Sequence, residues 1–315
     1  MTDPARAAFA RDLLAAIDHP PHHISPKYFY DDEGSGLFEA ITGLPEYYPT
    51  RTELDILKRR APEMAECMGP DIELVEYGAG ASRKVRFLLD ALPALRRFVP
   101  VDIAGDYLDA AAAQLRQQYP QLCITPVTAD FCEPLPLPAT LPGVRRAGFF
   151  PGSTLGNLDP DTARRFLAQA ARQLAGGGLL IGIDLVKDPV RLHAAYNDSA
   201  GLTARFNRNL LERANRELGC DFVPQQFQHY AFYQPALQRI EMHLVSTRAQ
   251  TVRIGTAVRT LSAGQHLHTE NSHKFTLEGF GGLARQAGLV PQHCWTDAGQ
   301  DFAVFWLVAP ATGCA

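Results

Sequence analysis

The chain has 315 residues, of which 46% are hydrophobic and 20% charged, and its formal net charge is −4. This composition is typical of a soluble globular protein with enough residues to bury a core in one or two domains, and the charge gives no reason to expect nucleic acid or an anionic membrane as partner. No apolar run approaches the roughly 20 residues that span a bilayer, and the first residues lack the apolar core of a signal peptide.

The sequence predicts little regular structure before residue 72. Residues 1–60 are expected to contain one helix, 5–17, followed by an irregular segment rich in proline, tyrosine and glycine. From residue 72 onward strand and helix patterns alternate, which favours a doubly wound parallel sheet. The expected strands are 72–76, 98–101, 123–128, 147–151 and 179–184, and the expected helices are 83–95, 104–118 and 160–174.

The alternation changes after residue 187. A helical stretch, 189–218, is followed by strand patterns at 228–233, 239–246 and 250–254, which suggest an antiparallel sheet in a second domain. A helix at 276–287 and a hairpin of strands 290–297 and 302–308 then return to the first pattern. We therefore expect one domain from 50–190 with 276–315, and a substrate-binding domain from 1–49 with 191–275.

A Gly-x-Gly turn follows the first expected strand, in the string Glu76-Tyr-Gly78-Ala-Gly80. Open α/β sheets bind nucleotides at the carboxyl ends of their strands, where glycines allow a tight turn and close approach to a ligand. A dinucleotide fingerprint has a third glycine where this chain has Arg83. The turn instead resembles motif I of S-adenosylmethionine (SAM) methyltransferases, although such a turn also occurs as a plain strand–helix connection.

Acidic residues end the first three strands. Asp102 follows the second strand at about the spacing expected for a carboxylate that holds ribose hydroxyls. Asp130 follows the third strand, where it is expected to accept from the adenine amino group while Phe131 packs on the ring. An ionised carboxylate only accepts hydrogen bonds, which suits hydroxyls and an amine. The alternative is that each acid caps the next helix.

Other unusual strings lie in the loops. Asn157 ends a glycine-rich segment, 151–157, after the fourth strand, and offers both a donor and an acceptor to an amino acid; a simple turn is equally consistent with the spacing. Glu270-Asn-Ser272 is expected between a strand and a helix, where it would alternatively cap the helix. The irregular N-terminal segment has four tyrosines that either line a site or pack in a loop: Tyr28, Tyr30, Tyr47 and Tyr48.

Cysteine and histidine spacing predicts neither a disulfide framework nor a metal site. The close histidine pairs are His22-His23 and His266-x-His268, and neither has the further ligands of a zinc site beside it in the sequence. We therefore expect no metal. The cysteines are scattered without a Cys-x-x-Cys pair, which indicates reduced thiols and a cytoplasmic location: Cys67, Cys123, Cys132, Cys220, Cys294 and Cys314.

Several strings together closely resemble the histidine Nα-methyltransferases of ergothioneine biosynthesis, from about residue 25 to the end of the chain. The strings are Ser25–Asp31, Gly43–Glu53, Glu76–Lys84, Pro151–Asn157, Gly182–Asp188, Phe206–Asn209 and Arg239–Met242. The resemblance implies a class I, Rossmann-like α/β fold with a terminal antiparallel hairpin and a second α+β substrate-binding domain. It also implies the transfer of three methyl groups from SAM to the α-amino group of L-histidine, which gives hercynine.

The resemblance assigns roles to matching residues. The cofactor contacts would be Gly78, Gly80, Lys84, Asp102, Asp130 and Phe131. The amino-acid pocket would be lined by Tyr30, Tyr47, Asn157, Tyr196, Met242, Glu270 and Ser272. Within it, Glu270 and Ser272 would bind the imidazole, and Tyr30 and Asn157 would be the catalytic residues, with Tyr30 orienting the amine. Asn271 and His273 depart from the family's pattern and leave side-chain selectivity open.

The substrate is expected to be a small molecule and the protein a monomer. Two alternatives stay open from the residues alone. One is an Nα-methyltransferase of another amino acid such as tryptophan, which has the same chemistry. The other is a non-catalytic SAM-binding partner protein, which has less need of the tyrosines and of Glu270.

Overall fold

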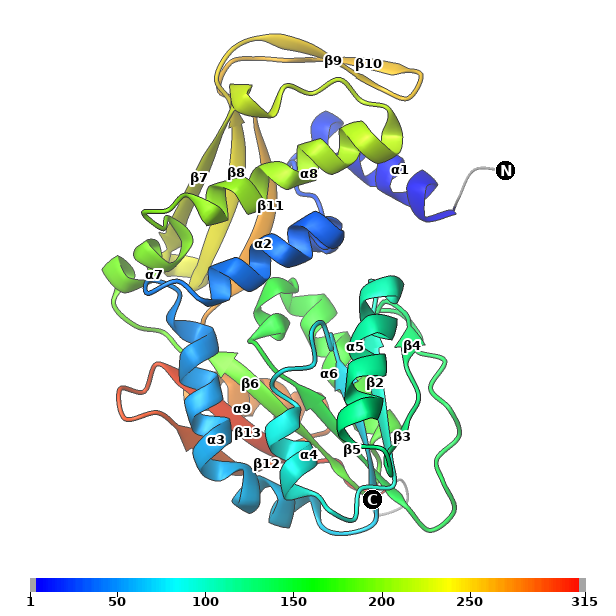
Figure 1. Ribbon diagram of the computed structural model, residues 1–315. Coiled ribbons are helices and arrows are strands. Elements are labelled where there is room, and N and C mark those ends of the chain that lie inside the picture. The colour runs from blue at the N-terminus through cyan, green and yellow to red at the C-terminus, as the bar shows by residue number, and fades with distance from the viewer. Residues whose placement is uncertain (1–3, 312–315) are drawn as a thin grey trace. The chain divides into compact units, whose positions relative to one another are not determined.

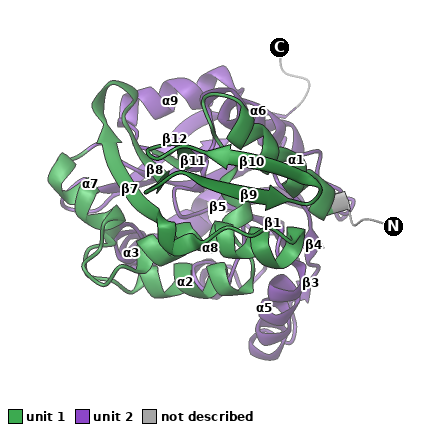
Figure 2. Cartoon of the chain, turned by 90° about the horizontal axis from the view of Figure 1, so that it is seen from above, with its two compact units in different colours: residues 1–48, 187–272 green, residues 49–186, 273–315 purple. Residues whose placement is uncertain are grey.

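The computed structural model describes residues 4–311 and divides into two compact units, coloured separately in Figure 2. Unit 1 comprises Met1–Tyr48 and Lys187–Ser272, and unit 2 comprises Pro49–Val186 and His273–Ala315. These bounds lie within four residues of those expected from the sequence, and the division into a cofactor domain and a substrate domain remains a prediction. Within the described part of the chain, no helix is both long and apolar enough to cross a membrane.

Unit 2 is built on an eight-stranded sheet in the order β12-β13-β6-β5-β1-β2-β3, with β4 also paired to β2 (Figure 1). The inner strands β5, β1 and β2 are parallel, and β13 runs antiparallel to both β6 and β12. A doubly wound α/β sheet closed by a terminal antiparallel hairpin is thus confirmed. The strands are β1 (Ile72–Tyr77), β2 (Arg97–Asp102), β3 (Cys123–Ile124), β4 (Val127–Thr128), β5 (Arg145–Phe150), β6 (Gly178–Asp184), β12 (Val290–Thr296) and β13 (Phe302–Val308).

Every residue of β1 and β6 is buried, which is why both read as nearly continuous apolar runs. The expected strand 123–128 is in fact two short strands, and the expected helix 83–95 is regular only over α4. Asp159 caps α6 by accepting from the Asp161 and Thr162 amides, and Pro160 occupies its first turn. The helices are α3 (Tyr48–Met68), α4 (Arg86–Ala91), α5 (Gly105–Gln118), α6 (Pro160–Gln173) and α9 (Leu277–Gln286).

In its described residues, unit 1 has a three-stranded sheet in the order β11-β8-β7, a two-stranded hairpin and four α-helices. Helix α8 lies across the sheet and α2 packs beside it (Figure 1). Asn207 on α8 fastens this packing, because it bonds the His243 carbonyl at 3.0 Å and the Thr269 hydroxyl at 2.7 Å. The elements are α1 (Pro4–Asp18), α2 (Asp32–Thr42), α7 (Pro189–Tyr196), α8 (Leu202–Leu218), β7 (Phe227–Gln234), β8 (Arg239–Ser246), β9 (Gln250–Ile254), β10 (Ala257–Leu261) and β11 (His266–His273).

Several expectations for these segments are wrong. The segment 19–60 is only partly irregular, because it holds α2 and most of α3. The helical stretch 189–218 is two helices, separated before Gly201, which has a φ of 70°. Strand β11 extends through Glu270-Asn-Ser272, which therefore does not lie between a strand and a helix.

Helix α2 shows why the sequence was misleading there. Its glycines weaken the helical pattern, but Asp31 caps the helix by accepting from the Gly34 amide at 2.8 Å. Asn209 on α8 donates to the same carboxylate at 2.7 Å, so the cap is also a tertiary contact. A Cβ on Gly34 would overlap the Phe29 carbonyl, which requires glycine at this position.

The described cysteines are free thiols, as expected. They are Cys67, Cys123, Cys132, Cys220 and Cys294, and Cys314 lies outside the described residues.

Candidate active site

The glycine turn of unit 2 follows β1 directly. Gly78 and Gly80 have φ values of 68° and 48°, a backbone region that strongly favours glycine. The amides of Gly78 and Ala79 donate to the Val101 carbonyl at 2.9 and 3.0 Å, which ties the turn to the end of β2. The amide of Gly80 donates to Asp102 Oδ2 at 2.8 Å. The turn and the second acid are therefore one hydrogen-bonded structure.

Asp102 has a structural role that is compatible with ligand binding. Its other oxygen, Oδ1, accepts from the Ala104 amide at 2.9 Å just before α5, whose N-cap is Ala104 and has no side-chain cap, so Asp102 does not cap this helix. A carboxylate has about four lone-pair sites, and these two bonds occupy one on each oxygen. Asp102 is thus held rigidly while it keeps acceptor capacity for hydroxyl groups.

Asp130 and Phe131 follow β4. Asp130 Oδ1 accepts from the Cys132 amide at 3.0 Å, which fixes the loop. The Phe131 ring packs edge-on against Phe150, with 5.2 Å between the ring centroids. A Cβ on Gly78 would lie 3.5 Å from Phe131 Cε1, so the glycine turn and this ring are neighbours. A half-buried aromatic edge beside a glycine turn provides a surface for an adenine ring.

A buried cluster of charges lies beside the turn. Lys84 Nζ pairs with Glu53 Oε2 at 2.6 Å, and Glu53 also accepts from the Gly152 amide at 2.9 Å. Glu76 is fully buried and its Oε2 has no hydrogen-bond partner among the described residues. Burial raises the pKa of Glu76 well above its usual value, against the lowering influence of Lys84. The nearby carboxylates of Asp102 and Glu53 raise that pKa further.

Glu53 is a residue that the sequence does not single out. It stands on α3, in a segment expected to be irregular, yet its side chain is only 1% exposed. The one available signal is its place at the end of the family-like string Gly43–Glu53. Glu53 acts as a positioning residue, because it holds both Lys84 and the loop that begins at Gly152.

Asn157 ends the short 3₁₀ helix η2 (Thr154–Asn157), in the loop after β5, and is half-buried. The loop turns through Gly152 and Ser153, whose φ values are 82° and 56°. Ser153 Oγ accepts from the Asp184 amide at 2.9 Å, which anchors the loop to the end of β6. Asn157 is therefore held at the carboxyl edge of the parallel strands, where open α/β sheets bind their ligands.

The aromatic residues predicted for the amino-acid pocket gather in unit 1. The Tyr47 ring lies 6.3 Å from that of Tyr196, and the Tyr30 ring lies 5.7 Å from that of Phe206. Phe38, on α2, contacts both Tyr30 and Tyr47, and the sequence does not predict it because α2 is not predicted. Tyr30, Tyr47, Tyr196, Phe38, Phe206 and Met242 belong to one hydrophobic cluster.

Strand β11 brings polar groups to this unit. The Tyr196 hydroxyl donates to Ser272 Oγ at 2.7 Å, which joins α7 to the strand. Glu270 lies two residues earlier on the strand and is only 7% exposed. The buried Glu270 carboxylate therefore lies on the same strand as the Tyr196–Ser272 hydrogen bond.

The other two tyrosines have structural partners. The Tyr28 hydroxyl donates to Asp12 at 2.7 Å, and burial together with this bond raises the pKa of Tyr28. Tyr48 accepts from Lys187 Nζ at 2.8 Å. Both are therefore explained by packing within unit 1.

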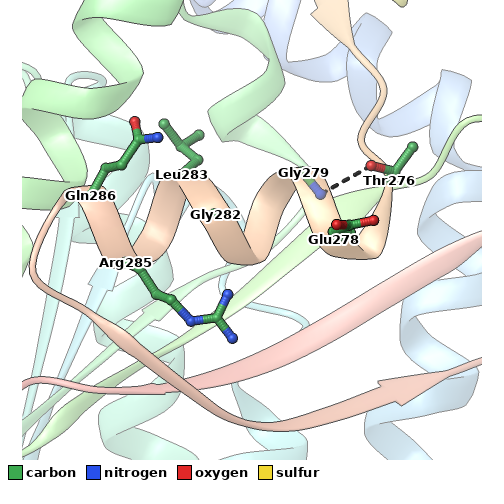
Figure 3. A pocket seen from close by; sticks show the side chains of 7 residues that line it. All are labelled: Thr276, Glu278, Gly279, Gly282, Leu283, Arg285 and Gln286. Atoms are coloured by element: carbon green, nitrogen blue, oxygen red, sulfur yellow. Dashed lines mark hydrogen bonds between the residues drawn. The ribbon is translucent and has the colours of Figure 1, made fainter.

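A hollow on the surface of α9 is unrelated to these residues (Figure 3). The Thr276 hydroxyl at one end of it caps α9 by accepting from the Gly279 amide at 3.0 Å. Its lining includes none of the predicted site residues and consists of Thr276, Glu278, Gly279, Gly282, Leu283, Arg285 and Gln286.

A glycine turn after β1, acids at successive strand ends and a sheet closed by an antiparallel hairpin define a class I SAM-dependent methyltransferase. The family model described as "Histidine-specific methyltransferase, SAM-dependent" matches residues 9–309, and the chain belongs to this family. It is accordingly an enzyme that uses SAM as methyl donor.

Named relatives cover nearly the whole chain. The histidine N-alpha-methyltransferase of Mycolicibacterium smegmatis is 44% identical over 96% of this chain and 95% of its own length. Ergothioneine biosynthesis protein 1 of Neurospora crassa is 29% identical, and the match covers 88% of this chain and 32% of that protein. The 4-dimethylallyltryptophan N-methyltransferase of Claviceps fusiformis is 23% identical over 94% of this chain and 90% of its own.

Proposed function

We propose that this enzyme transfers three methyl groups from SAM to the α-amino group of L-histidine, giving hercynine, the first step of ergothioneine biosynthesis. The observation that carries the proposal is Glu270, a buried carboxylate on the strand whose Ser272 is bonded to Tyr196. An imidazole N–H is a suitable partner for such a carboxylate. The 44% identity to a histidine N-alpha-methyltransferase supports the same substrate.

The residues divide the chemistry between the units. In unit 2, we assign SAM binding to the turn at Gly78 and Gly80 together with Lys84, Asp102, Asp130 and Phe131. Methyl transfer from a sulfonium is an in-line displacement, so the main task of the protein is positioning. Asn157 keeps its predicted role as donor and acceptor for the amino-acid end of the substrate.

The amine must be neutral to attack. A free α-amino group has a pKa near 8 in peptides, so part of it is deprotonated without a strong base. Tyr30 orients the amine through its hydroxyl, and water takes the proton. Each methylated product is cationic, and the aromatic cluster around Tyr30 and Tyr47 tolerates a growing ammonium group through cation–π attraction.

A second candidate is methylation of a tryptophan-derived amine, which the name of the Claviceps relative suggests. An indole N–H is also a donor from which a carboxylate can accept, so the chemistry of Glu270 does not separate the two substrates by itself. The relative is only 23% identical, compared with 44% for the histidine enzyme, which favours histidine.

The first test is mass spectrometry of the products formed with SAM and each amino acid, including mono- and dimethylhistidine. The proposal expects a gain of three methyl groups on histidine alone. Methylation of tryptophan and not histidine would support the second candidate. Binding of SAM without methylation of any amine would instead indicate a binding protein.

The variant Glu270→Gln tests side-chain recognition. Losing the charged acceptor should lower kcat/KM for histidine by about 10–100-fold, because hydrogen bonds to charged groups contribute about 1.5–3 kcal/mol. The Kd for SAM should stay unchanged. Glu212→Gln, an exposed change on α8 of the same unit, is the matched control and should behave as wild type. Equal losses in histidine turnover and SAM binding would point to misfolding.

The monomeric state and the cytoplasmic location remain predictions, and light scattering of the purified enzyme tests the first.

A further inference from the structure

Five of the ten histidines of the chain form one cluster of neighbouring rings beside the sheet of unit 1. The His243 and His268 rings are stacked with centroids 4.5 Å apart, and His266 approaches His243 edge-on at 5.0 Å. His23 lies 5.0 Å from His268, and His22 lies 5.7 Å from His266. None of these residues is predicted to bind SAM or the amino acid, so the proposed reaction does not explain the cluster.

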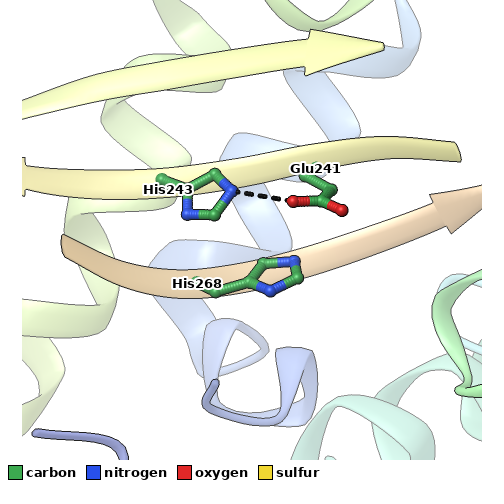
Figure 4. A group of neighbouring side chains, drawn as sticks. All are labelled: Glu241, His243 and His268. Carbon is green, nitrogen blue, oxygen red and sulfur yellow. Dashed lines mark hydrogen bonds and ion pairs between the residues drawn. The ribbon is translucent and has the colours of Figure 1, made fainter. Parts of the chain in front are cut away.

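The sheet explains how these residues meet. Glu241 and His243 are two residues apart on β8, so they point to the same face, and Met242 between them points to the other. His268 on the neighbouring strand β11 points toward them (Figure 4). The chain between residues 246 and 266 separates the two strands in the sequence, so no further ligand stands beside His266-x-His268 there. In the structure, Glu241 and His243 lie beside His268. The reason for expecting no metal there is therefore wrong.

The geometry of the three side chains fits a small divalent cation. One ligand atom from each of Glu241, His243 and His268 lies within 4.8 Å of the others, and all three residues are buried. Glu241 Oε2 and His243 Nε2 are 3.2 Å apart. Metal–ligand distances of about 2.0–2.2 Å at tetrahedral angles put two ligand atoms roughly 3.3–3.5 Å apart, close to this separation. The His268 ligand atom lies no more than 4.8 Å from each of these two atoms.

The charges also suit a cation. The Glu241 carboxylate lies between Arg239 and His243. Arg239 bonds only Oε1, at 2.6 and 2.8 Å, which leaves Oε2 directed at His243. Its positive charge weakens metal binding without blocking the site.

We propose that Glu241, His243 and His268 form a binding site for a divalent transition-metal cation of the zinc class, with two imidazole nitrogens, one carboxylate oxygen and a fourth position for water. Two neutral imidazoles and a carboxylate are donors that zinc takes in proteins. Calcium and magnesium prefer all-oxygen sites and should not compete. The cation would cross-link β8 and β11, the strands that carry Met242 and Glu270.

Isothermal titration of ZnCl₂ into untagged, chelator-treated protein, in a buffer free of histidine, tests the proposal. The full chain should take up one equivalent of Zn²⁺ with a Kd in the micromolar range or below, and elemental analysis should confirm the ratio. The variants Glu241→Gln, His243→Gln and His268→Gln should each weaken binding by at least about tenfold. His293→Gln removes an exposed histidine of unit 2 and should leave the Kd unchanged.

A second measurement separates loss of the ligand from loss of the fold. Circular dichroism in the absence of metal should be the same for wild type and each variant, and Zn²⁺ should raise the unfolding temperature of the wild type and of His293→Gln only. No saturable Zn²⁺ binding by the wild type would overturn the proposal. Binding of one equivalent that all three variants keep at the wild-type Kd would overturn it as well.

Discussion

Replacing Glu53 by glutamine tests whether one buried carboxylate organises the cofactor side of unit 2. Both oxygens of Glu53 accept from the Gly152 amide at 2.9 Å, and Oε2 also accepts from Lys84 at 2.6 Å. A glutamine amide has one acceptor oxygen, so its NH₂ group meets either the Lys84 ammonium or the Gly152 N–H, donor against donor. Glutamine has nearly the same shape, so the change removes hydrogen bonding and charge without opening a cavity.

The expected loss of unfolding free energy is about 2–4 kcal/mol. Hydrogen bonds to charged groups contribute about 1.5–3 kcal/mol, and removing one partner of a buried ion pair costs about 3–5 kcal/mol. The expected loss is smaller than the full cost of breaking a buried ion pair, because the Lys84 side chain is 20% exposed and can turn toward water. Lys84 and the loop after Gly152 should also lose their fixed positions, so we expect SAM binding to weaken by about tenfold, or about 1.4 kcal/mol.

Urea unfolding followed by tryptophan fluorescence measures this loss in the correct unit. The chain has two tryptophans, Trp295 and Trp306, and both are buried in unit 2. Their emission therefore reports on the unit that contains Glu53, and titration calorimetry gives the Kd for SAM. Asp55→Asn is the matched control on the same helix: its exposed pair with Arg59 should contribute no more than about 0.5 kcal/mol. A loss in Glu53→Gln below about 1 kcal/mol, with unchanged SAM affinity, would refute the reasoning.

Two further predictions concern single residues of the two units. For Glu76, burial raises the folded-state pKa well above 4.5, so the folded protein keeps a proton that the unfolded chain releases, and stability should fall as pH rises above about 4.5. Glu76→Gln should therefore gain stability relative to wild type between pH 5 and pH 8 in the same urea assay; an identical pH dependence in the two proteins would contradict the burial argument. For Tyr30, removing the hydroxyl in Tyr30→Phe should slow methylation while SAM binding stays unchanged, because the ring contacts with Phe38 and Phe206 are kept. Wild-type turnover in that variant would exclude an orienting role for the hydroxyl.

Much of unit 2 is determined locally in the sequence. Strands β1 and β6 are buried on both faces and therefore read as apolar runs, and the glycines at 78 and 80 mark a turn that needs positive φ. The terminal hairpin is readable for the same reason, since its alternation and turn lie within a few neighbouring residues. The acids at the strand ends also follow, because the carboxyl ends of parallel strands share one edge of the sheet.

Local patterns fail where distant residues supply the stabilisation. Helix α2 contains glycines that weaken its pattern, but its cap at Asp31 is completed by Asn209 on α8. Helix α3 has Pro49 in its first turn and Pro62 within it, and packing rather than propensity keeps it helical. Strand β11 is polar along much of its length, so its sequence does not predict a buried strand. The strand is buried against β8 and α8, where its polar side chains form hydrogen bonds such as that from Thr269 to Asn207.

The sequence by itself therefore determined the class of fold, the glycine turn and the identity of most candidate site residues, since these depend on local periodicity and on short strings. Only the tertiary structure decided which charges meet. Glu53 reaches Lys84 from a helix 31 positions earlier in the chain, and His268 reaches Glu241 and His243 from another strand. Charges and metal ligands act over a few ångströms in space, and no spacing along the chain encodes that distance when folding brings separate elements together.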